Sequence, residues 1–477
     1  MIKMESKKNL SKPVKATIGF TVSNILQKGI AFLAVPIFTR LMSTQQYGQY
    51  SVFLSWLEIF EIITTFRIGW GGFVVGLNKY TDDREGYTSS LQCLSIIITT
   101  VFLFLYLIFH TFINSFTGMS TSLTLMMFAI MYFLPAMKFW TIRERVEYRY
   151  KAVLVVTAIM STLIVAFGSF AAVVSTEKDV AVIFSRVVVQ GILGIILIVY
   201  NCKGRFVIFN KEYWRRTLKF NVPLIPYYLS MVVLNSSDRI VIEQLVNGTA
   251  VAIYSVAYTA SMCMQIVTNA INGVLQPWLY EHIRENNTKD ASKIINVSLI
   301  LVALLNLVLI AFAPEIMAIL APNKYSSAIW VMPPLAASVT VMFFYQHFVN
   351  IEFYFEESKL TSIASIGAAV LNLVLNYIFI PIFGYLAAGY TTLASYLIFG
   401  ISHYFFMNAV CKKNNYKEKI VDIKSMLAIL ISFFVVTAIL LIGYNINFIR
   451  YAFIIVVMII AFYKKDIIIK FIKNKGI

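Results

Sequence analysis

Apolar runs separated by short polar segments follow one another along the whole chain. A helix needs roughly 20 apolar residues to cross the hydrocarbon core of a bilayer, and fourteen runs offer that length. They are residues 16–38, 46–77, 87–113, 121–140, 152–174, 180–200, 217–243, 249–276, 293–313, 325–351, 360–381, 386–410, 425–443 and 447–463. The pattern predicts an all-α polytopic membrane protein with about fourteen transmembrane helices. Two runs, 46–77 and 325–351, exceed one crossing, so we expect these helices to tilt or protrude.

A polar stripe runs along one apolar segment, Leu245–Gln276. Its members recur at spacings of three and four, which places them on one face of a helix. They are Tyr254, Tyr258, Ser261, Gln265, Asn269, Asn272 and Gln276. The segment Leu41–Gly72 aligns with it without a gap when Tyr50 is set against Tyr254, and Glu61 then lies opposite Gln265. This pattern indicates a parallel repeat of the kind found in membrane transporters, although chance similarity between two apolar helices is the alternative.

Charge decides the orientation of these helices. Only 13% of the residues are charged, and the mean hydropathy is +0.77. With the N-terminus in the cytoplasm, 32 of the 40 Lys and Arg residues lie on the inner side and three, Arg40, Lys178 and Lys324, in outer loops. The positive-inside rule therefore predicts that both termini are cytoplasmic. The net charge of +17 does not indicate nucleic-acid binding, because the basic residues lie between apolar runs.

The repeat and the loop lengths predict four parts. These are a six-helix N-terminal lobe (1–201), a cytoplasmic linker (202–216), a second six-helix lobe (217–411), and two additional helices with a basic tail (412–477). The loops leave no room for a soluble catalytic domain, and no ATP-binding P-loop is present. The four cysteines and four histidines are scattered, so we predict no disulfide, metal site or cofactor and no enzyme activity.

The ionisable residues inside apolar segments are the first candidates for function. Such groups cost about 2.5–3.5 kcal/mol each at the centre of a bilayer and usually face a cavity or a partner. Lys28 shares a helix face with Asn24 and is predicted to be a cationic point in a water-filled cavity. A structural ion pair with Glu58 or Glu61 on the next helix is the alternative, and the two interpretations are compatible. Arg67 is out of phase with Glu58 in a straight helix, which favours snorkelling, unless the following glycines unwind the helix end.

The second half of the chain also carries polar and ionisable residues inside its apolar segments. Asn235 and Arg239 share a helix face, although Arg239 is equally consistent with interfacial snorkelling or with a pair to Asp238 or Glu243. Tyrosines on the opening helices suit sugar rings, and a membrane-interface aromatic belt is their alternative interpretation. The full predicted cavity set is Lys28, Asn24, Tyr50, Glu61, Asn235, Arg239, Tyr254, Tyr258, Gln265, Asn269 and Asn272.

Four motifs resemble those of a known family. They are TRLMSTQQYGQYSV (Thr39–Val52), KFNVPLIPYYLSMVVLNSSDRIVIEQL (Lys219–Leu245), AIYSVAY (Ala252–Tyr258) and FGYLAAGYTTLASY (Phe383–Tyr396). Together they resemble the polysaccharide repeat-unit flippases, the O-antigen and capsule translocases of the multidrug/oligosaccharidyl-lipid/polysaccharide exporter superfamily. The likeness spans roughly residues 15–410. Its motifs mark the family and leave the substrate open.

The resemblance implies two six-helix lobes around a central cavity and alternating access in a bacterial cytoplasmic (inner) membrane. The implied substrate is an undecaprenyl-diphosphate-linked oligosaccharide, which moves from the inner to the outer leaflet. Lys28 and Arg239 are where we expect the diphosphate or acidic sugars to bind. An H⁺ or Na⁺ gradient is the expected energy source, with Glu58 or Glu61 as the titrating group. The polymerase and the chain-length regulator of the same pathway are the implied protein partners.

Three other functions are compatible with parts of this pattern. A drug/cation antiporter would share the fold, but the two additional helices and the Asp-Arg pair, Asp238–Arg239, disfavour it. A glycan polymerase or ligase typically needs a large outer loop with Arg and His, and the outer loops here are short. A lipid II flippase would need a cavity richer in arginine than this sequence indicates.

Overall fold

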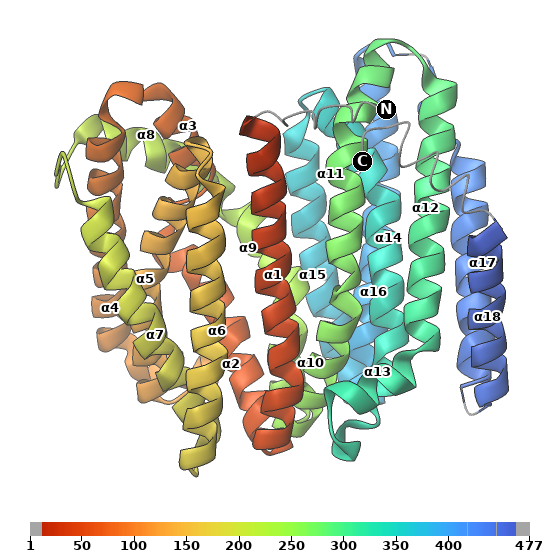
Figure 1. The fold of residues 1–477 in the computed structure, drawn as a ribbon, viewed down its shortest axis with the longest axis horizontal. Coiled ribbons are helices and arrows are strands. Elements are labelled where there is room, and N and C mark those ends of the chain that lie inside the picture. The colour runs from red at the N-terminus through yellow and green to blue at the C-terminus, as the bar shows by residue number, and fades with distance from the viewer. Residues whose placement is uncertain (1–11, 417, 445, 464–477) are drawn as a thin grey trace, which may run out of the picture. The chain divides into compact units, whose positions relative to one another are not determined.

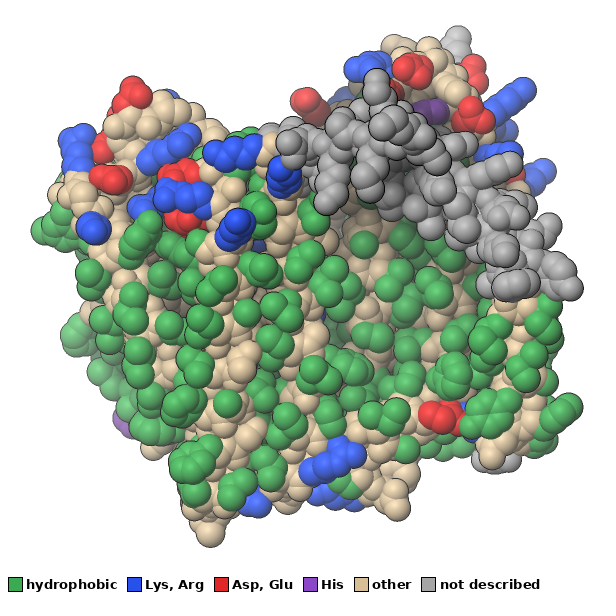
Figure 2. Space-filling view, viewed as in Figure 1, with side chains coloured by type: hydrophobic (Ala, Val, Ile, Leu, Met, Phe, Trp, Pro, Cys, Tyr) green, Lys and Arg blue, Asp and Glu red, His purple; other side chains and the backbone are tan. Residues whose placement is uncertain are grey.

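All regular secondary structure in the described part of the chain is helical, which confirms the predicted all-α class. A computed structural model describes residues 12–416, 418–444 and 446–463, and within these ranges every regular element is an α-helix or a short 3₁₀-helix (Figure 1). On the face drawn in Figure 2, hydrophobic side chains cover the middle of the helices, while Lys and Arg gather at their ends. This distribution is the one that a bilayer requires of a multi-pass protein.

The chain divides into two compact units, Met1–Leu229 and Ser230–Ile477. The first unit contains α1 (Lys12–Leu41), α2 (Thr44–Thr65), α3 (Gly71–Lys79), η1 (Thr81–Asp83), α4 (Arg84–Thr117), α5 (Thr121–Val146), α6 (Tyr150–Val174), α7 (Lys178–Asn201), α8 (Lys211–Asn221) and η2 (Val222–Leu224). The helix α9 (Ile225–Leu245) crosses the boundary. The second unit continues with α10 (Gly248–Met262), α11 (Met264–Arg284), α12 (Thr288–Ala311), α13 (Ala313–Leu320), η3 (Asn323–Tyr325), α14 (Ala328–Tyr354), α15 (Ser358–Phe383), α16 (Leu386–Lys413), α17 (Ile423–Ile442) and α18 (Asn447–Tyr463).

Within the described residues, twelve helical stretches are long and apolar enough to cross a membrane. Each of the fourteen expected segments falls on helices, but two of them are not among these twelve. The helix α2 is interrupted by polar residues, including Glu58 and Glu61, and α18 offers only the shorter apolar stretch Asn447–Ile459. The multi-pass architecture is therefore confirmed, and the crossing by these two helices stays a prediction.

The helix α8 belongs to the first unit because it packs on α3 and α4. Trp214 Nε1 donates to the backbone oxygen of Ser90 at 3.1 Å, and the Tyr213 hydroxyl donates to Asp83 Oδ2 at 2.7 Å. Residues up to Leu229 therefore belong to the first unit, whereas the predicted first lobe ends at residue 201 and the predicted second lobe begins at residue 217. The division into six-helix lobes at those boundaries stays a prediction.

The expectation of one continuous helix over 46–77 is wrong. The helix α2 ends at Thr65, and Phe66 and Arg67 take positive φ values of 49° and 45°, which an α-helix does not allow. The chain becomes helical again at Gly71, where α3 begins. At Gly72 a Cβ would lie 2.9 Å from Asn221 Nδ2, so this close approach of α3 to the end of α8 requires a residue without a side chain.

The two units open in the same register, as the repeat predicts. The helix α1 ends at Leu41 and α9 ends at Leu245, the residue that aligns with it. The next helix of each unit is then capped by a side chain. Ser43 Oγ accepts from Gln46 N at the start of α2, and Asn247 Oδ1 accepts from Ala250 N at the start of α10.

A charged cluster anchors α18 to the second unit. Arg450 is buried, and its Nη1 donates to Glu315 Oε2 at 2.8 Å and to the backbone oxygen of Ala311 at 3.0 Å. The Tyr451 hydroxyl donates to Glu315 Oε1 at 2.7 Å. Partial burial raises the pKa of Glu315, but the hydrogen bonds from Arg450 and Tyr451 outweigh it and hold this pKa below its ordinary value.

We expect Glu315→Gln to loosen α18, because it leaves the buried Arg450 guanidinium without its counter-charge. The loss should be about 2 kcal/mol, the scale of a hydrogen bond to a charged group. Since the pKa of Glu315 is lowered in the folded state, its contribution is complete above the unfolded-state pKa and is lost as pH falls through the lower folded-state value. Thermal unfolding of the purified protein in detergent between pH 7 and pH 3 measures both effects.

The exposed Glu285, changed to Gln, is the matched control because it also removes one carboxylate at a helix end. If Glu315→Gln and Glu285→Gln change the melting temperature equally, the Arg450–Glu315 pair does not anchor α18.

Candidate functional site

A fully enclosed carboxylate lies in the second unit. Asp238, on α9, is 1% exposed and accepts hydrogen bonds from three other helices. The donors are the Tyr254 hydroxyl from α10, Asn376 Nδ2 from α15 at 2.6 Å and Thr392 Oγ1 from α16 at 2.8 Å. A carboxylate buried in this way is stable only when such donors, a proton or a cation compensate its charge.

A second layer of polar groups holds these donors in place. Asn376 Nδ2 also donates to Asn372 Oδ1 at 3.2 Å, and Asn372 Nδ2 donates to Thr392 Oγ1 at 3.3 Å. Thr391 Oγ1 donates to Asn376 Oδ1, and Ser237 Oγ donates to Asn372 Oδ1 at 3.5 Å. Carboxylate, amide and hydroxyl oxygens converge here, which are the ligands that hard cations prefer. We call Asp238, Asn372, Asn376, Thr391 and Thr392 the Asp238 cluster.

Four predicted site residues gather next to this cluster on α9 and α10. The Arg239 guanidinium lies 4.3 Å from the centre of the Tyr258 ring, and its Nε donates to Ser255 Oγ at 3.2 Å. Asn235 Oδ1 accepts from the Tyr258 hydroxyl at 3.4 Å and from the Tyr396 hydroxyl at 3.1 Å. Tyr254 donates directly to Asp238. The structure therefore brings Asn235, Arg239, Tyr254 and Tyr258 together, and it directs Arg239 to an aromatic face.

Of the remaining stripe residues, Ser261 lies at the end of α10, where its Oγ donates to the backbone oxygen of Met332 on α14 at 3.1 Å, and the others lie on α11. Gln265 Nε2 donates to the Met342 sulfur at 3.7 Å, and Asn272 Oδ1 accepts from Asn350 Nδ2 at 2.8 Å. Asn269 is exposed. The stripe thus contributes to packing between helices at Gln265 and Asn272, as well as offering polar groups to solvent.

The first unit contains a cationic cavity of about 650 Å³. Its cations are Lys138 and Arg145, two turns apart on α5. Arg145 Nη2 donates to Asn24 Oδ1 at 3.4 Å, and the Lys138 ammonium lies 5.0 Å from the centre of the Trp70 ring. The residues that line it come from α1, α3, α5 and α6 and include Ser23, Asn24, Gln27, Trp70, Gly71, Lys138, Thr141, Arg145 and Thr157.

The other predicted residues of the first unit lie elsewhere. Lys28 and Glu58 are exposed and do not line this cavity. Tyr50 is buried, with its ring 5.8 Å from that of Phe38. Glu61 is half-buried, and the cations whose charges act on it are Lys138 and Arg67.

Arg67 takes a position that a straight helix would not allow. The break after Thr65 turns its guanidinium to within 4.7 Å of the centre of the Trp70 ring and 5.1 Å of that of Tyr228. Arg67 and Lys138 therefore both lie against the ring of Trp70, and cation–π attraction stabilises each of these contacts. The prediction that Arg67 snorkels to the membrane surface depends on a straight helix. The helix instead ends at Thr65, before the glycines at which α3 begins.

The sequence analysis missed the two cavity cations and most of the Asp238 cluster. The positive-inside count places both cations at the inner end of the expected helix 121–140, whereas α5 continues to Val146 and carries both of them in the cavity wall. Asn372 and Asn376, one helical turn apart in an apolar segment, were the available signal for the cluster.

Comparisons with known proteins agree on family and fold. A family model described as "Polysaccharide biosynthesis protein" matches residues 14–283. A search of curated protein sequences gives no match. Among solved structures, an inward closed conformation of the lipid II flippase MurJ aligns with a TM-score of 0.69 and 15% identity, covering 94% of this chain and 100% of that chain.

Two further structures share this fold. An inward-facing multidrug resistance MATE family transporter of the MOP superfamily aligns with a TM-score of 0.61 and 14% identity, covering 81% of this chain and 96% of that chain. A MOP superfamily transporter from Pyrococcus furiosus aligns with a TM-score of 0.53 and 12% identity, covering 87% and 100%. The chain therefore has the fold of MOP superfamily transporters, and the family resemblance of its motifs is confirmed.

Substitution of Asp238 should separate cation binding from folding. Asp238→Ala leaves the buried Tyr254, Asn376 and Thr392 donors without their acceptor and should cost about 3 kcal/mol. Asp238→Asn keeps an acceptor oxygen and should fold, but it removes the charge that holds a cation. The melting temperature of the wild type in detergent should rise with Na⁺ at constant pH or, if the ion is H⁺, should depend more steeply on pH than that of Asp238→Asn, and Asp238→Asn should not respond to Na⁺.

Asp290→Asn is the control for this prediction, because Asp290 is an exposed aspartate of the same unit. An ion-dependent shift in melting temperature that survives in Asp238→Asn would place the cation outside the Asp238 cluster.

Proposed function

Because the chain belongs to the polysaccharide biosynthesis protein family, we propose that it is a flippase for a lipid-linked oligosaccharide. The substrate is an undecaprenyl-diphosphate-linked repeat unit of an O-antigen or a capsule. It moves by alternating access from the inner to the outer leaflet of the bacterial cytoplasmic membrane. The observation that carries this proposal is the cationic cavity of the first unit, with Lys138, Arg145 and Asn24 in its wall.

The chemistry of this cavity suits a diphosphate next to a sugar. An arginine fork binds phosphate oxygens in a bidentate way, and a lysine acts as a compact point charge beside it. Trp70 adds an aromatic face, the surface that we expect a sugar ring to use, and Asn24, Gln27 and Thr141 add hydrogen-bonding groups. Lys138 and Arg145 take over the role that the sequence analysis gave to Lys28.

The Asp238 cluster supports coupling to an ion gradient. It holds a buried carboxylate among hydroxyl and amide groups from three further helices, so a proton or Na⁺ bound there would neutralise the charge of Asp238. Glu61 remains a second candidate for the coupling group. Its protonation would change the charge beside Lys138 and Arg67, in reach of the proposed substrate cavity.

The same cavity argues against export of cationic drugs, because two cations in its wall would repel a cationic substrate. The proteins of like fold include transporters described as multidrug exporters, so the antiporter stays the main rival. Lipid II also carries a diphosphate, so a lipid II flippase would fit the cations equally well. A glycan polymerase would need catalytic groups that the sequence does not offer.

The polymerase and chain-length regulator of the same pathway are the protein partners that this function implies.

The decisive experiment uses a strain that lacks the gene. We expect an undecaprenyl-diphosphate oligosaccharide to accumulate, accessible only from the cytoplasmic side, while surface polysaccharide disappears. A wild-type plasmid copy should restore the polysaccharide. The double variant Lys138→Gln/Arg145→Gln should restore less than about one tenth of it, because a hydrogen bond to a charged group contributes about 1.5–3 kcal/mol.

Lys203→Gln/Lys211→Gln is the matched control, since it removes two exposed cations of the same unit that do not line the cavity. It should restore wild-type levels. Intact surface polysaccharide in the deletion strain, with no lipid-linked glycan, would refute the repeat-unit flippase. Accumulation of lipid II in its place would identify the other substrate, and a gain of sensitivity to cationic dyes would identify the antiporter.

A further inference from the structure

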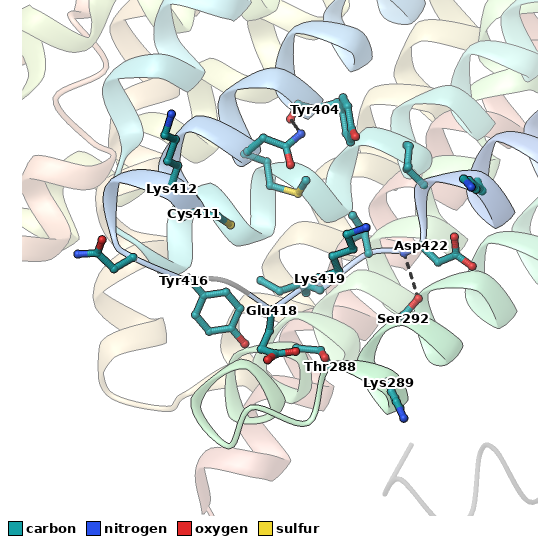
Figure 3. A pocket seen from close by; sticks show the side chains of 17 residues that line it. Thr288, Lys289, Ser292, Tyr404, Cys411, Lys412, Tyr416, Glu418, Lys419 and Asp422 are labelled. Atoms are coloured by element: carbon teal, nitrogen blue, oxygen red, sulfur yellow. Dashed lines mark hydrogen bonds between the residues drawn. The ribbon is translucent and has the colours of Figure 1, made fainter.

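A second polar pocket, of about 840 Å³, lies in the second unit and is not used by the proposed transport function (Figure 3). It forms where α16 ends, where the loop after α16 returns, and where α12 and α17 begin. Its lysines are Lys289, Lys412, Lys419 and Lys424. In Figure 3, Lys419 lies within the group, while Lys412 and Lys289 lie at opposite margins.

The loop that closes this pocket is held in place by its neighbours. Ile420 and Val421 are buried in the core of the unit. The Tyr416 ring lies 5.8 Å from that of Phe355, and the Asp422 backbone N–H donates to Ser292 Oγ at 3.1 Å. These anchors hold Tyr416 on one side and Ile420 to Asp422 on the other, so binding requires little ordering of these residues.

The charges of the pocket are unbalanced in favour of cations. Only two carboxylates, Glu418 and Asp422, line it beside the four lysines. Asp422 is engaged as the cap of α17, where it accepts from Ser425 N at 3.3 Å and from Ser425 Oγ at 2.5 Å. Across the described residues, Lys289, Lys412 and Lys419 form no ion pair within 4.0 Å.

Lys413, the residue next to Lys412, differs from it in its surroundings. Lys413 points elsewhere, forms an ion pair with Glu357 and does not line the pocket. Two consecutive lysines at the end of α16 therefore differ, because Lys413 has a carboxylate partner and Lys412 faces a pocket with a surplus of positive charge. A surplus of this kind in a preformed cavity attracts an anion.

The pocket also offers neutral donors suited to an oxyanion. Hydroxyl groups of Thr288, Ser292 and Tyr404 line it, and the N-terminal turn of α12 opens at its edge. Helix N-termini carry partial positive charge and add to the attraction of the lysines for an anion. Phosphate, with several strong acceptor oxygens, matches a set of ammonium and hydroxyl donors.

We propose that this pocket binds the phosphate of an anionic phospholipid headgroup. Three apolar stretches, Thr288–Ala311, Leu386–Lys413 and Ile423–Ile442, end or begin at this level, so the pocket lies where headgroups are found. Basic pockets between membrane helices bind such headgroups. The sequences of both chain termini are themselves basic, which makes them poor occupants. A soluble phosphate compound is the other source of the same chemistry.

Native mass spectrometry of the purified full-length protein in detergent tests this proposal with phosphatidylglycerol, phosphatidylcholine and inorganic phosphate as probes. We expect phosphatidylglycerol to bind and phosphatidylcholine not to bind. Lys412→Gln/Lys419→Gln should weaken phosphatidylglycerol binding about 25-fold, because each lysine near a membrane surface contributes about five-fold. Lys412→Arg/Lys419→Arg should retain binding, and its melting temperature and that of the Gln variant show whether both fold.

Lys203→Gln/Lys211→Gln removes the same charge from the first unit and should leave phosphatidylglycerol binding unchanged. Equal loss in this control and in Lys412→Gln/Lys419→Gln would show that only the net charge matters, and it would overturn the site. Binding that persists in Lys412→Gln/Lys419→Gln would also overturn it. Binding of inorganic phosphate that depends on Lys412 and Lys419, without binding of phosphatidylglycerol, would overturn the lipid as the source and identify a soluble ligand. None of these outcomes depends on flippase activity.

Discussion

The absence of water from the bilayer core is the constraint on which this structure depends. Backbone groups there must bond within the chain, so the described part of the protein is helical throughout. Charged side chains must find compensation in the same way, and Asp238 shows the most demanding case. Its carboxylate is enclosed by donors from α10, α15 and α16, so four helices of the second unit are joined through one buried charge.

The same constraint governs breaks in helices. An unwound segment is tolerated in a membrane only where other groups form hydrogen bonds with its backbone N–H and C=O groups. The break between α2 and α3 is of this kind. Gly72 N–H donates to Asn221 Oδ1 at 3.3 Å, and the Tyr87 hydroxyl donates to the Gly72 carbonyl at 3.2 Å. The unwound turn places Arg67 on the ring of Trp70, beside Lys138. A local backbone irregularity thus helps to assemble the cationic and aromatic surroundings of the cavity.

Features that depend on periodicity, or on residues close together in the chain, could be predicted from the sequence. The apolar segments, the polar stripe and the matching register of the two units are of this kind. The Asp238 cluster could not be found in this way, because Asn376 and Thr392 lie 138 and 154 positions from Asp238. Lys138 and Arg145 were missed for a different reason. Basic residues at a helix end are consistent with both an inner loop and a cavity wall, and only the packing of α1, α3 and α6 around Lys138 and Arg145 decides between them.

The helix α9 suggests how an ion and a substrate site could be linked through the chain itself. Its first residues belong to the first unit, where the Tyr228 ring lies 5.1 Å from the Arg67 guanidinium. Ten positions later, the same helix carries Asp238 into its cluster in the second unit. A change in the charge of Asp238 alters the hydrogen bonds that fix α9 to α10, α15 and α16. This helix therefore links the Asp238 cluster to Tyr228 through the chain itself. Pro223 and Pro226, which lie at its start, are the points at which that link can bend.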